Sequence, residues 1–201
     1  MSGVEQRRAE RRAQARKTIR LEVLDAARRV AGRDGARNLS LRNVAAEAGY
    51  APAALYGYFR SRDELVLALA ADDLAAMART MRETAVAHRA EFRLHAVASL
   101  AVDLLAKGET LAAASACMNR SNDSDAERLF NGRLISVLTV LSAAAGISAE
   151  RRNSQADVVL LAAALTGLAL LRRAGRLQTL GFSVEEVLAR LPKVFSAAAA
   201  A

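Results

Sequence analysis

Residues 39–59 read LSLRNVAAEAGYAPAALYGYF. Ser40 can cap a short helix, and Gly49 can end that helix. Pro52 suits the first position of a second short helix, which we expect to run to Tyr58. Two short helices joined by a tight turn at glycine are typical of a helix-turn-helix.

The composition of the whole chain favours helices over strands. Its 201 residues include 47 Ala, against 25 Val, Ile and Thr taken together, and only two Pro. Ala loses almost no entropy on entering a helix, whereas β-branched residues favour strands. We therefore predict an all-α protein that is long enough to bury a core in one or two domains.

Apolar spacing and capping residues divide the rest of the chain into further helices. Residues 1–17 are basic and almost free of large apolar side chains, so we expect a frayed helix or a disordered arm there. Helical periodicity begins at Ile19 and ends at Gly32 and Gly35. Capping pairs are predicted at Ser61 with Glu64, Ser124 with Glu127, and Ser183 with Glu186. We predict about nine helices in total. Three are short and lie near the N-terminus, and the longer ones lie near 61–86, 91–106, 109–118, 124–145, 149–174 and 184–196.

The excess positive charge lies in the first third of the chain. The net charge is +8, and residues 1–62 carry 14 Lys and Arg against 6 Asp and Glu, whereas residues 63–201 carry 15 of each. This asymmetry is typical of a module that binds a polyanion and is attached to a neutral body. A solvated basic tail is the alternative interpretation.

Other residues exclude several classes of protein. Cys117 is the single cysteine, so it cannot form an internal disulfide, and with His88 and His95 it provides too few ligands for a structural zinc site. No apolar segment follows the charged N-terminus, so we expect no signal peptide. The longest apolar stretch, Val158 to Leu171, is too short to span a bilayer and suits a buried helix. We therefore expect a cytoplasmic protein with no cofactor, no metal, no membrane partner and no enzymatic activity.

Aromatic residues gather at the second short helix. Tyr58 and Phe59 favour a core role, because aromatic side chains supply much of the burial energy of a small domain. The residues themselves leave Tyr56 open between packing and donation of its hydroxyl to a phosphate. The second helix of a helix-turn-helix enters the major groove, where small residues at its start allow close approach to base edges. The small residues here are Ala51, Pro52, Ala53 and Ala54.

Several short motifs lie between residues 18 and 66. The motifs are Val23-Leu24-Asp25-Ala26-Ala27, Gly35, Ser40 to Ala45, Ala48-Gly49, Leu55-Tyr56, Tyr58-Phe59, Ser61-Arg62-Asp63 and Leu65. This stretch resembles the TetR family of transcriptional regulators. The resemblance implies a three-helix DNA-binding domain followed by an all-α ligand-binding and dimerisation domain. We accordingly predict a basic arm over 1–17, a helix-turn-helix domain over 18–62, and an effector-binding and dimerisation domain over 63–201.

The resemblance also implies roles for individual residues. It places Ser40 and Arg42 on a phosphate or a base, and Tyr56 and Arg62 on phosphates. It places Ala51, Pro52 and Ala53 at the start of the recognition helix. The sequence departs from the family pattern at four positions: Ala31 stands for a frequent Phe, Tyr50 for a small aliphatic residue, Ala51 for a capping Ser, and Gly57 for a phosphate-contacting His.

An effector site is implied among the middle helices. Small-molecule pockets combine apolar residues with a few polar ones. The residues that fit this description are Met77, Met81, Phe92, Met118, Asn119, Phe130, Leu134 and Thr139. Each of them also fits plain core packing. The chain has no Trp and few other aromatic residues, which favours an aliphatic or flexible ligand over a flat one.

The apolar helix near residues 157–173 has two nearly opposite apolar stripes. At about 100° per residue, one stripe comprises Leu160, Ala164, Gly167 and Leu171, and the other comprises Val158, Ala162, Leu165 and Ala169. A surface helix of a monomer has a single apolar face, so the second stripe needs a partner, most simply the same helix of a second subunit. Because Ala164 and Gly167 permit close helix approach, we predict that their stripe forms the dimer interface.

These features predict a homodimeric, sequence-specific DNA-binding regulator of transcription, acting as a repressor that a small-molecule effector releases from its operator. Two alternatives remain open. One is a DNA-binding regulator that a protein partner controls or that has no ligand. The other is an all-α enzyme with a basic tail.

Overall fold

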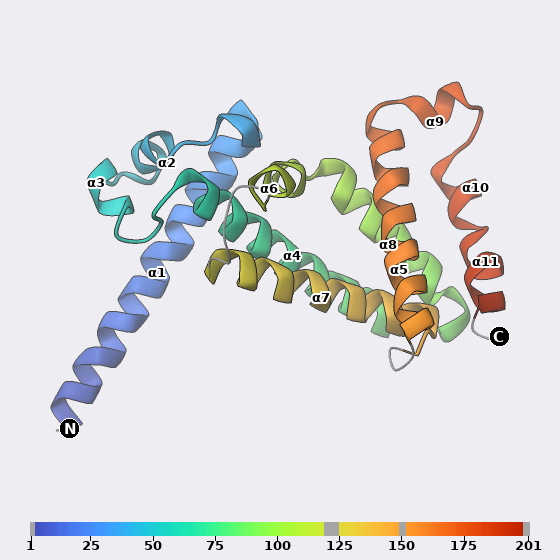
Figure 1. The fold of residues 1–201 in the computed structure, drawn as a ribbon, viewed down its shortest axis with the longest axis horizontal. Coiled ribbons are helices and arrows are strands. Elements are labelled where there is room, and N and C mark those ends of the chain that lie inside the picture. The colour runs from blue at the N-terminus through green and yellow to red at the C-terminus, as the bar shows by residue number, and fades with distance from the viewer. Residues whose placement is uncertain (1–2, 119–124, 149–151, 199–201) are drawn as a thin grey trace. The chain divides into compact units, whose positions relative to one another are not determined.

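A computed structural model describes residues 3–118, 125–148 and 152–198 of the chain (Figure 1). These residues form helices and contain no strand, which confirms the predicted all-α class. In chain order the elements are α1 (Gly3–Asp34), the 3₁₀ helix η1 (Ala36–Asn38), α2 (Leu41–Ala48), α3 (Pro52–Leu55), α4 (Arg62–Ala87), α5 (Ala90–Lys107), α6 (Thr110–Met118), α7 (Asp125–Ala145), α8 (Arg152–Arg173), α9 (Arg176–Thr179), α10 (Val184–Leu188) and α11 (Leu191–Ala198).

The chain divides into two compact units. The first unit comprises Met1–Ala70 with Glu109–Arg128, and the second comprises Ala71–Gly108 with Leu129–Ala201. The first unit therefore includes α6 and the start of α4 in addition to residues 18–62. The domain boundaries drawn from the sequence stay predictions.

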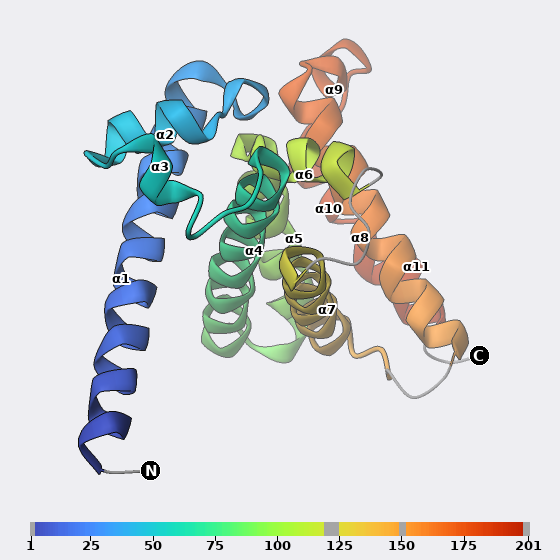
Figure 2. The same cartoon turned by 60° about the vertical axis from the view of Figure 1, so that its left-hand side comes forward.

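In the first unit, α1 packs against α2 and η1, and α6 also packs against η1. Figure 2 shows α2 and α3 beside the C-terminal half of α1. Val23 and Val30 of α1, Val44 of α2 and Phe59 after α3 are fully buried. A small core of apolar side chains from three helices therefore fixes the orientation of α2 and α3 on α1.

The first helix is longer than the sequence predicts. α1 is a single helix from Gly3, so residues before Ile19 are helical rather than a disordered arm. The prediction that Gly32 helps to end the helix was wrong, because one glycine costs only about 1 kcal/mol in a helix interior. The helix ends before Gly35, which has a φ of +85° and donates its N–H to the carbonyl of Ala31.

Serine caps begin three of the helices as predicted. The Ser40 hydroxyl accepts from the N–H of Asn43 at α2. The Ser61 hydroxyl accepts from the N–H of Glu64 over 3.1 Å at α4. Ser183 forms a reciprocal capping box with Glu186 at α10. The predicted cap at Ser124 lies outside the described residues.

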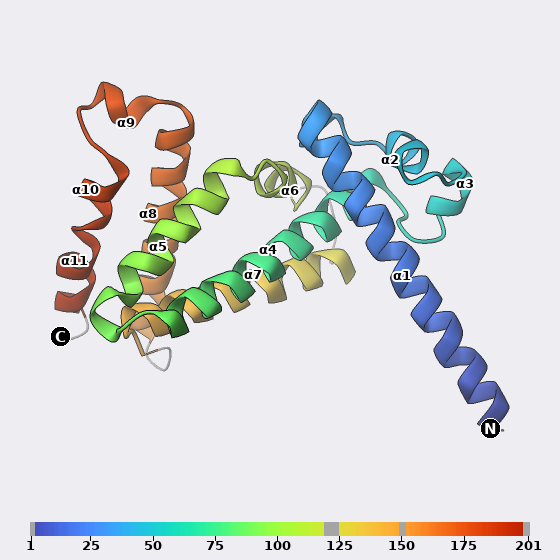
Figure 3. The same cartoon turned by 180° about the vertical axis from the view of Figure 1, so that it is seen from behind.

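In the second unit, α5 packs against α8, α10 and α11, and α8 also packs against α9 and α11 (Figure 3). The sequence predicts one helix over 184–196, but the structure has α10 and α11 separated after Leu188. Pro192 explains the break, because it has no N–H to donate to the carbonyl four residues earlier.

One helix of the described residues, α8, is long and apolar enough to cross a membrane by length and composition alone. A core helix of a soluble protein passes the same test. Leu161 and Leu165 are fully or almost fully buried, whereas Leu160 and Leu170 are 60% and 66% exposed. The helix therefore packs against its own unit through one face and presents a second apolar face.

Candidate functional site

The turn between α2 and α3 depends on a glycine in the left-handed conformation. Gly49 has a φ of +74°, and the next N–H, that of Tyr50, donates to the carbonyl of Ala45 over 2.9 Å. A residue with a side chain is strained at this φ, so glycine permits the abrupt change of direction. Val44 of α2 and Leu55 of α3 are buried, which holds the two helices together.

Regular helical structure in α3 ends at Leu55, short of the predicted Tyr58. The N–H groups of Tyr58 and Phe59 both donate to the Leu55 carbonyl over 2.9 Å, so the chain tightens into a turn. Leu55 and Phe59 lie in the core, and Tyr58 is half-buried. Tyr56 is 61% exposed, so its hydroxyl is available to a partner outside the protein.

Most of the residues predicted to contact DNA are exposed on α2 and α3. Arg42 lies in the first turn of α2, and Ser40 before it is half-exposed. Pro52 begins α3 with no side-chain cap from Ala51, consistent with the loss of a capping serine at that position. The start of α3 is exposed at Ala51, Pro52 and Ala53. These small side chains leave the start of α3 open to a close-fitting partner.

Arg62 lies in a different environment from the one that the sequence suggests. Its Nε donates to the carbonyl of Leu39 over 2.8 Å, and its Nη2 donates to the carbonyls of Arg37 and Ala36 over 2.9 and 3.3 Å. The guanidinium thus holds the chain between η1 and α2. This placement favours a positioning role over the predicted phosphate contact.

Asp63 connects Arg62 to α6. One oxygen of Asp63 lies 3.2 Å from Nη1 of Arg62 and accepts a hydrogen bond from the thiol of Cys117 over 3.3 Å. Burial raises the pKa of the Cys117 thiol, and the hydrogen bond to Asp63 raises this pKa further. The thiol is therefore protonated at neutral pH and acts as a buried donor that joins α6 to the start of α4.

Ion pairs and a tyrosine hydroxyl also connect α1 to the helix-turn-helix. Glu47 accepts from Arg29 over 2.8 Å and from Arg33 over 3.0 Å. These two hydrogen bonds hold the pKa of Glu47 below its ordinary value of 4.5. The hydroxyl of Tyr50 donates to Glu22 over 2.6 Å, and this bond raises the pKa of Tyr50. Tyr50, which stands where the family pattern has a small aliphatic residue, thus makes a contact to α1.

Two arginines of α1 contact the segment after α3, and neither contact was predicted from the sequence. Arg16 donates to the carbonyl of Gly57 over 2.7 Å and lies over the ring of Tyr58, 5.5 Å from its centroid. Arg20 lies 4.6 Å from the centroid of the Phe59 ring. Their four-residue spacing places both on one face of α1, which is a signal present in the sequence.

The residues nominated for an effector site do not gather in one place. Met77, Met81 and Phe130 belong to the core, whereas Phe92 and Leu134 are exposed. Met118 is half-exposed in α6, which belongs to the first unit, and Asn119 lies outside the described residues. Thr139 is the nominated residue that lines a groove of the second unit.

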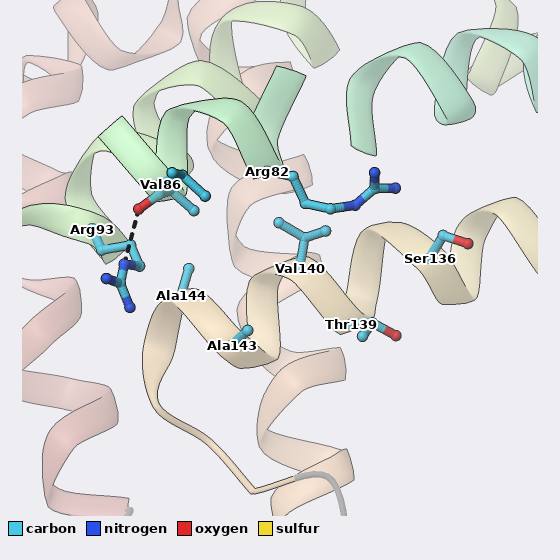
Figure 4. Close-up of a pocket in the computed structure, with 9 residues that line it drawn as sticks. Arg82, Val86, Arg93, Ser136, Thr139, Val140, Ala143 and Ala144 are labelled. Carbon is cyan, nitrogen blue, oxygen red and sulfur yellow. Dashed lines mark hydrogen bonds between the residues drawn. The ribbon is translucent and has the colours of Figure 1, made fainter. Parts of the chain in front are cut away.

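This groove has a volume of about 530 Å³ and lies between the end of α4, the start of α5 and α7. Figure 4 shows Arg93 beside Val86 and Ala144, and Arg82 farther along, above Val140. Its floor is mainly Ala and Val, with Ser136 and Thr139 as polar neighbours. Nε of Arg93 donates to the carbonyl of Ala85 over 3.0 Å, which orients this guanidinium. The groove therefore combines an apolar floor with two cationic groups.

The two stripes of α8 differ in their surroundings. Val158, Leu165 and Ala169 of one stripe are buried, and Ala162 is half-buried. The other stripe, Leu160, Ala164, Gly167 and Leu171, is exposed throughout. Val159 and Leu170 are also exposed and widen the apolar surface beyond the predicted stripe.

A helix-turn-helix held on a long first helix, followed by an all-helical unit, defines a class of DNA-binding regulators. Residues 23–69 match the family model described as bacterial regulatory proteins, tetR family. Over these residues the chain is similar to the TetR family of bacterial regulators.

One curated relative is similar to part of the chain. The HTH-type nicotine-responsive transcriptional repressor HdnoR of Paenarthrobacter nicotinovorans is 38% identical over 78 residues, which cover 35% of this chain and 40% of that protein. The match thus spans about two-fifths of the length of this curated relative.

Solved structures share the fold. A TetR transcriptional regulator from Rhodococcus sp. RHA1 superposes with a TM-score of 0.67 at 20% identity, covering 89% of this chain and 96% of that one. The transcriptional regulator FadR from Bacillus subtilis, in complex with stearoyl-CoA, superposes with a TM-score of 0.60 at 17% identity, covering 87% and 96%.

Proposed function

We propose that this protein is a cytoplasmic transcriptional regulator that binds operator DNA through α2 and α3. The observation that carries the proposal is the exposed start of α3, with small residues at Ala51–Ala53 and the exposed Tyr56 one turn later. Such a helix can enter the major groove while Tyr56 and Arg42 contact phosphates. The positive charge of residues 1–62 supports a polyanionic partner.

The regulator acts as a homodimer. The exposed apolar half of α8 carries Leu160 and Leu170, which are each more than half exposed in a single chain. A two-fold axis places the same surface of two copies in contact, and Ala164 and Gly167 allow the helices to approach closely. Two copies then present two recognition helices to an inverted repeat.

A small-molecule effector releases the regulator from DNA, and the groove of the second unit supports this part of the proposal. Its volume of about 530 Å³ suits a drug-sized molecule. The apolar floor favours an aliphatic body, and Arg82 and Arg93 favour an anionic group. We therefore take the effector to be an amphipathic acid.

Release follows from linkage. An effector that binds more tightly to a dimer whose recognition helices do not match both half-sites weakens operator binding by the same factor. The sign of regulation is repression, in keeping with the repressor HdnoR among the relatives.

The decisive experiment is selection of duplexes from a random pool by the full-length protein, followed by fluorescence anisotropy. We expect the selected sequences to share an inverted repeat and to bind at least about 10³-fold more tightly than a scrambled duplex. Selection without a common sequence, or equal affinity for the scrambled duplex, would contradict the proposal.

A further inference from the structure

The N-terminal half of α1 carries a dense set of positive charges in helical form. Its basic residues are Arg7, Arg8, Arg11, Arg12, Arg16 and Lys17. All six lie on exposed positions of the same continuous helix as the buried Val23. The orientation of these charges is therefore set by the packing of the C-terminal half of α1.

Contacts at the middle of α1 determine which face of this helix is turned toward the recognition helix α3. Arg16 donates to the carbonyl of Gly57, just after α3, and Arg20 lies over the ring of Phe59. Residues four apart lie on one helix face, so Arg12 and Arg8 continue this row beyond Arg16. At 1.5 Å per residue, the row extends about 12 Å from Arg16 to Arg8.

We infer that Arg8 and Arg12 bind backbone phosphates of double-stranded DNA beside the base pairs that α3 contacts. This inference rests on the proposed function. Each DNA strand carries one charge per about 3.4 Å of helix axis, so a basic row about 12 Å long spans several phosphates. Because the row is already helical and its register is fixed at Arg16, little conformational entropy is lost when it docks.

The acidic residues of this segment are compatible with such a contact. Glu10 lies on the side of the helix away from the row and accepts a hydrogen bond from Gln6 over 3.4 Å. Glu5 lies about one turn before Arg8 on the row side and marks its N-terminal end. The basic row therefore begins at Arg8 and continues toward α3.

The test compares two double variants of the full-length protein that remove the same charge from opposite faces of α1. Arg8→Ala with Arg12→Ala removes the row, and Arg7→Ala with Lys17→Ala is the matched control. Alanine preserves the helix, which circular dichroism checks. Both variants and the wild type bind the duplex selected by the wild type, over a range of salt concentrations.

We expect the row variant to bind about tenfold or more weakly at 0.1 M salt. Its slope of log K against log salt becomes less negative by about 1.8 per subunit, because two phosphate contacts are lost from each. The control changes much less, and hydroxyl-radical footprints lose backbone protection at the edge of the site in the row variant only.

Provided that the wild type binds its selected duplex, an equal loss of DNA affinity in both variants, or no loss in either, would overturn the inference. Failure of the wild type to prefer any duplex would instead overturn the proposed function, and the inference with it.

Discussion

Three tyrosines lie close together in the sequence, and the structure places each in different surroundings. Tyr50 donates to Glu22, and Tyr58 is half-buried against Arg16. Tyr56 is 61% exposed. The sequence resemblance assigns Tyr56 to a phosphate, and its exposure is compatible with that assignment.

We predict that Tyr56→Phe weakens operator binding about 5- to 10-fold, since a hydrogen bond is worth about 1 kcal/mol. The loss is similar for scrambled DNA, because phosphate contacts carry no sequence information. Anisotropy with both duplexes measures it. Tyr50→Phe is the control, which lowers thermal stability and leaves DNA affinity nearly unchanged. An unaltered affinity of Tyr56→Phe would assign Tyr56 to packing.

Arg62 has two alternative roles that its position in the sequence does not distinguish. The family pattern places a cation on phosphate here, but the guanidinium donates to two backbone carbonyls of η1 and to the carbonyl of Leu39 after it. A planar group with five donors can hold several carbonyls at once, which a lysine cannot do.

We predict that Arg62→Lys and Arg62→Ala both lower the free energy of unfolding, by about 2 kcal/mol, because the carbonyls lose charged donors. Urea denaturation measures this loss, with the exposed Arg60→Ala as control. If both variants keep full stability and only Arg62→Ala loses DNA affinity, Arg62 contacts a phosphate as the sequence resemblance implies.

At the scale of elements, Glu47 connects α2 to α1. Its pKa lies below the ordinary value because Arg29 and Arg33 donate to its carboxylate. The ionised form thus stabilises the folded state above the unfolded pKa of about 4.5, and this contribution is lost as the pH falls through the lower folded pKa.

We predict that Glu47→Gln lowers the Tm at pH 7, and that the difference from the wild type narrows as the pH falls from about 5 toward 3. Thermal unfolding followed by circular dichroism gives both curves. Asp25→Asn, which removes an exposed pair with Arg28, should change the Tm little. A difference that persists unchanged at acidic pH would refute the assigned cause.

A charge introduced on one face of α8 should have a different effect from a charge introduced on the other. A Cβ added at Gly167 meets nothing within 4 Å inside the chain, so the subunit itself has room there. Leu165 is 1% exposed, so its replacement would bury an unpaired charge.

We predict that Gly167→Glu yields a folded monomer with much weaker operator binding, while Leu165→Glu unfolds the subunit at a cost of several kcal/mol. Light scattering, circular dichroism and anisotropy measure the three properties, and Gly167→Ala should remain a dimer. A dimeric Gly167→Glu with full affinity would place the interface elsewhere. A folded monomer from Leu165→Glu would show that the Leu165 face forms the dimer interface and the Gly167 face packs in the subunit.

At the scale of the whole molecule, the proposed effector and the operator influence each other's binding reciprocally. We predict that dodecanoate, as a probe acid, weakens operator binding and itself binds less tightly to the operator-bound protein by the same factor. Dodecanol, which lacks the charge, should act at least about tenfold more weakly, and Arg93→Gln should abolish this difference.

Calorimetry and anisotropy with and without the selected duplex measure both affinities. Equal potency of dodecanol and dodecanoate would show that Arg82 and Arg93 do not recognise an anionic group.

The sequence alone determined the features that local interactions control. The caps at Ser40, Ser61 and Ser183 act over three residues, and Gly49 meets the need for a positive φ within one turn. The helix-turn-helix was therefore predictable from residues 39–59. The break at Pro192 was also local and could have been predicted, because the missing N–H is a property of that residue alone.

Only the tertiary structure decided what depends on residues distant in the chain. Arg62 turns toward carbonyls 23 and 26 residues away, and Arg16 donates to a carbonyl 41 residues away. Periodicity showed that α8 has two apolar stripes, but which stripe is buried follows from its packing against α5 and α11. Such contacts form between surfaces that no local pattern pairs in advance, because their partners come from separate elements and meet only when the chain folds.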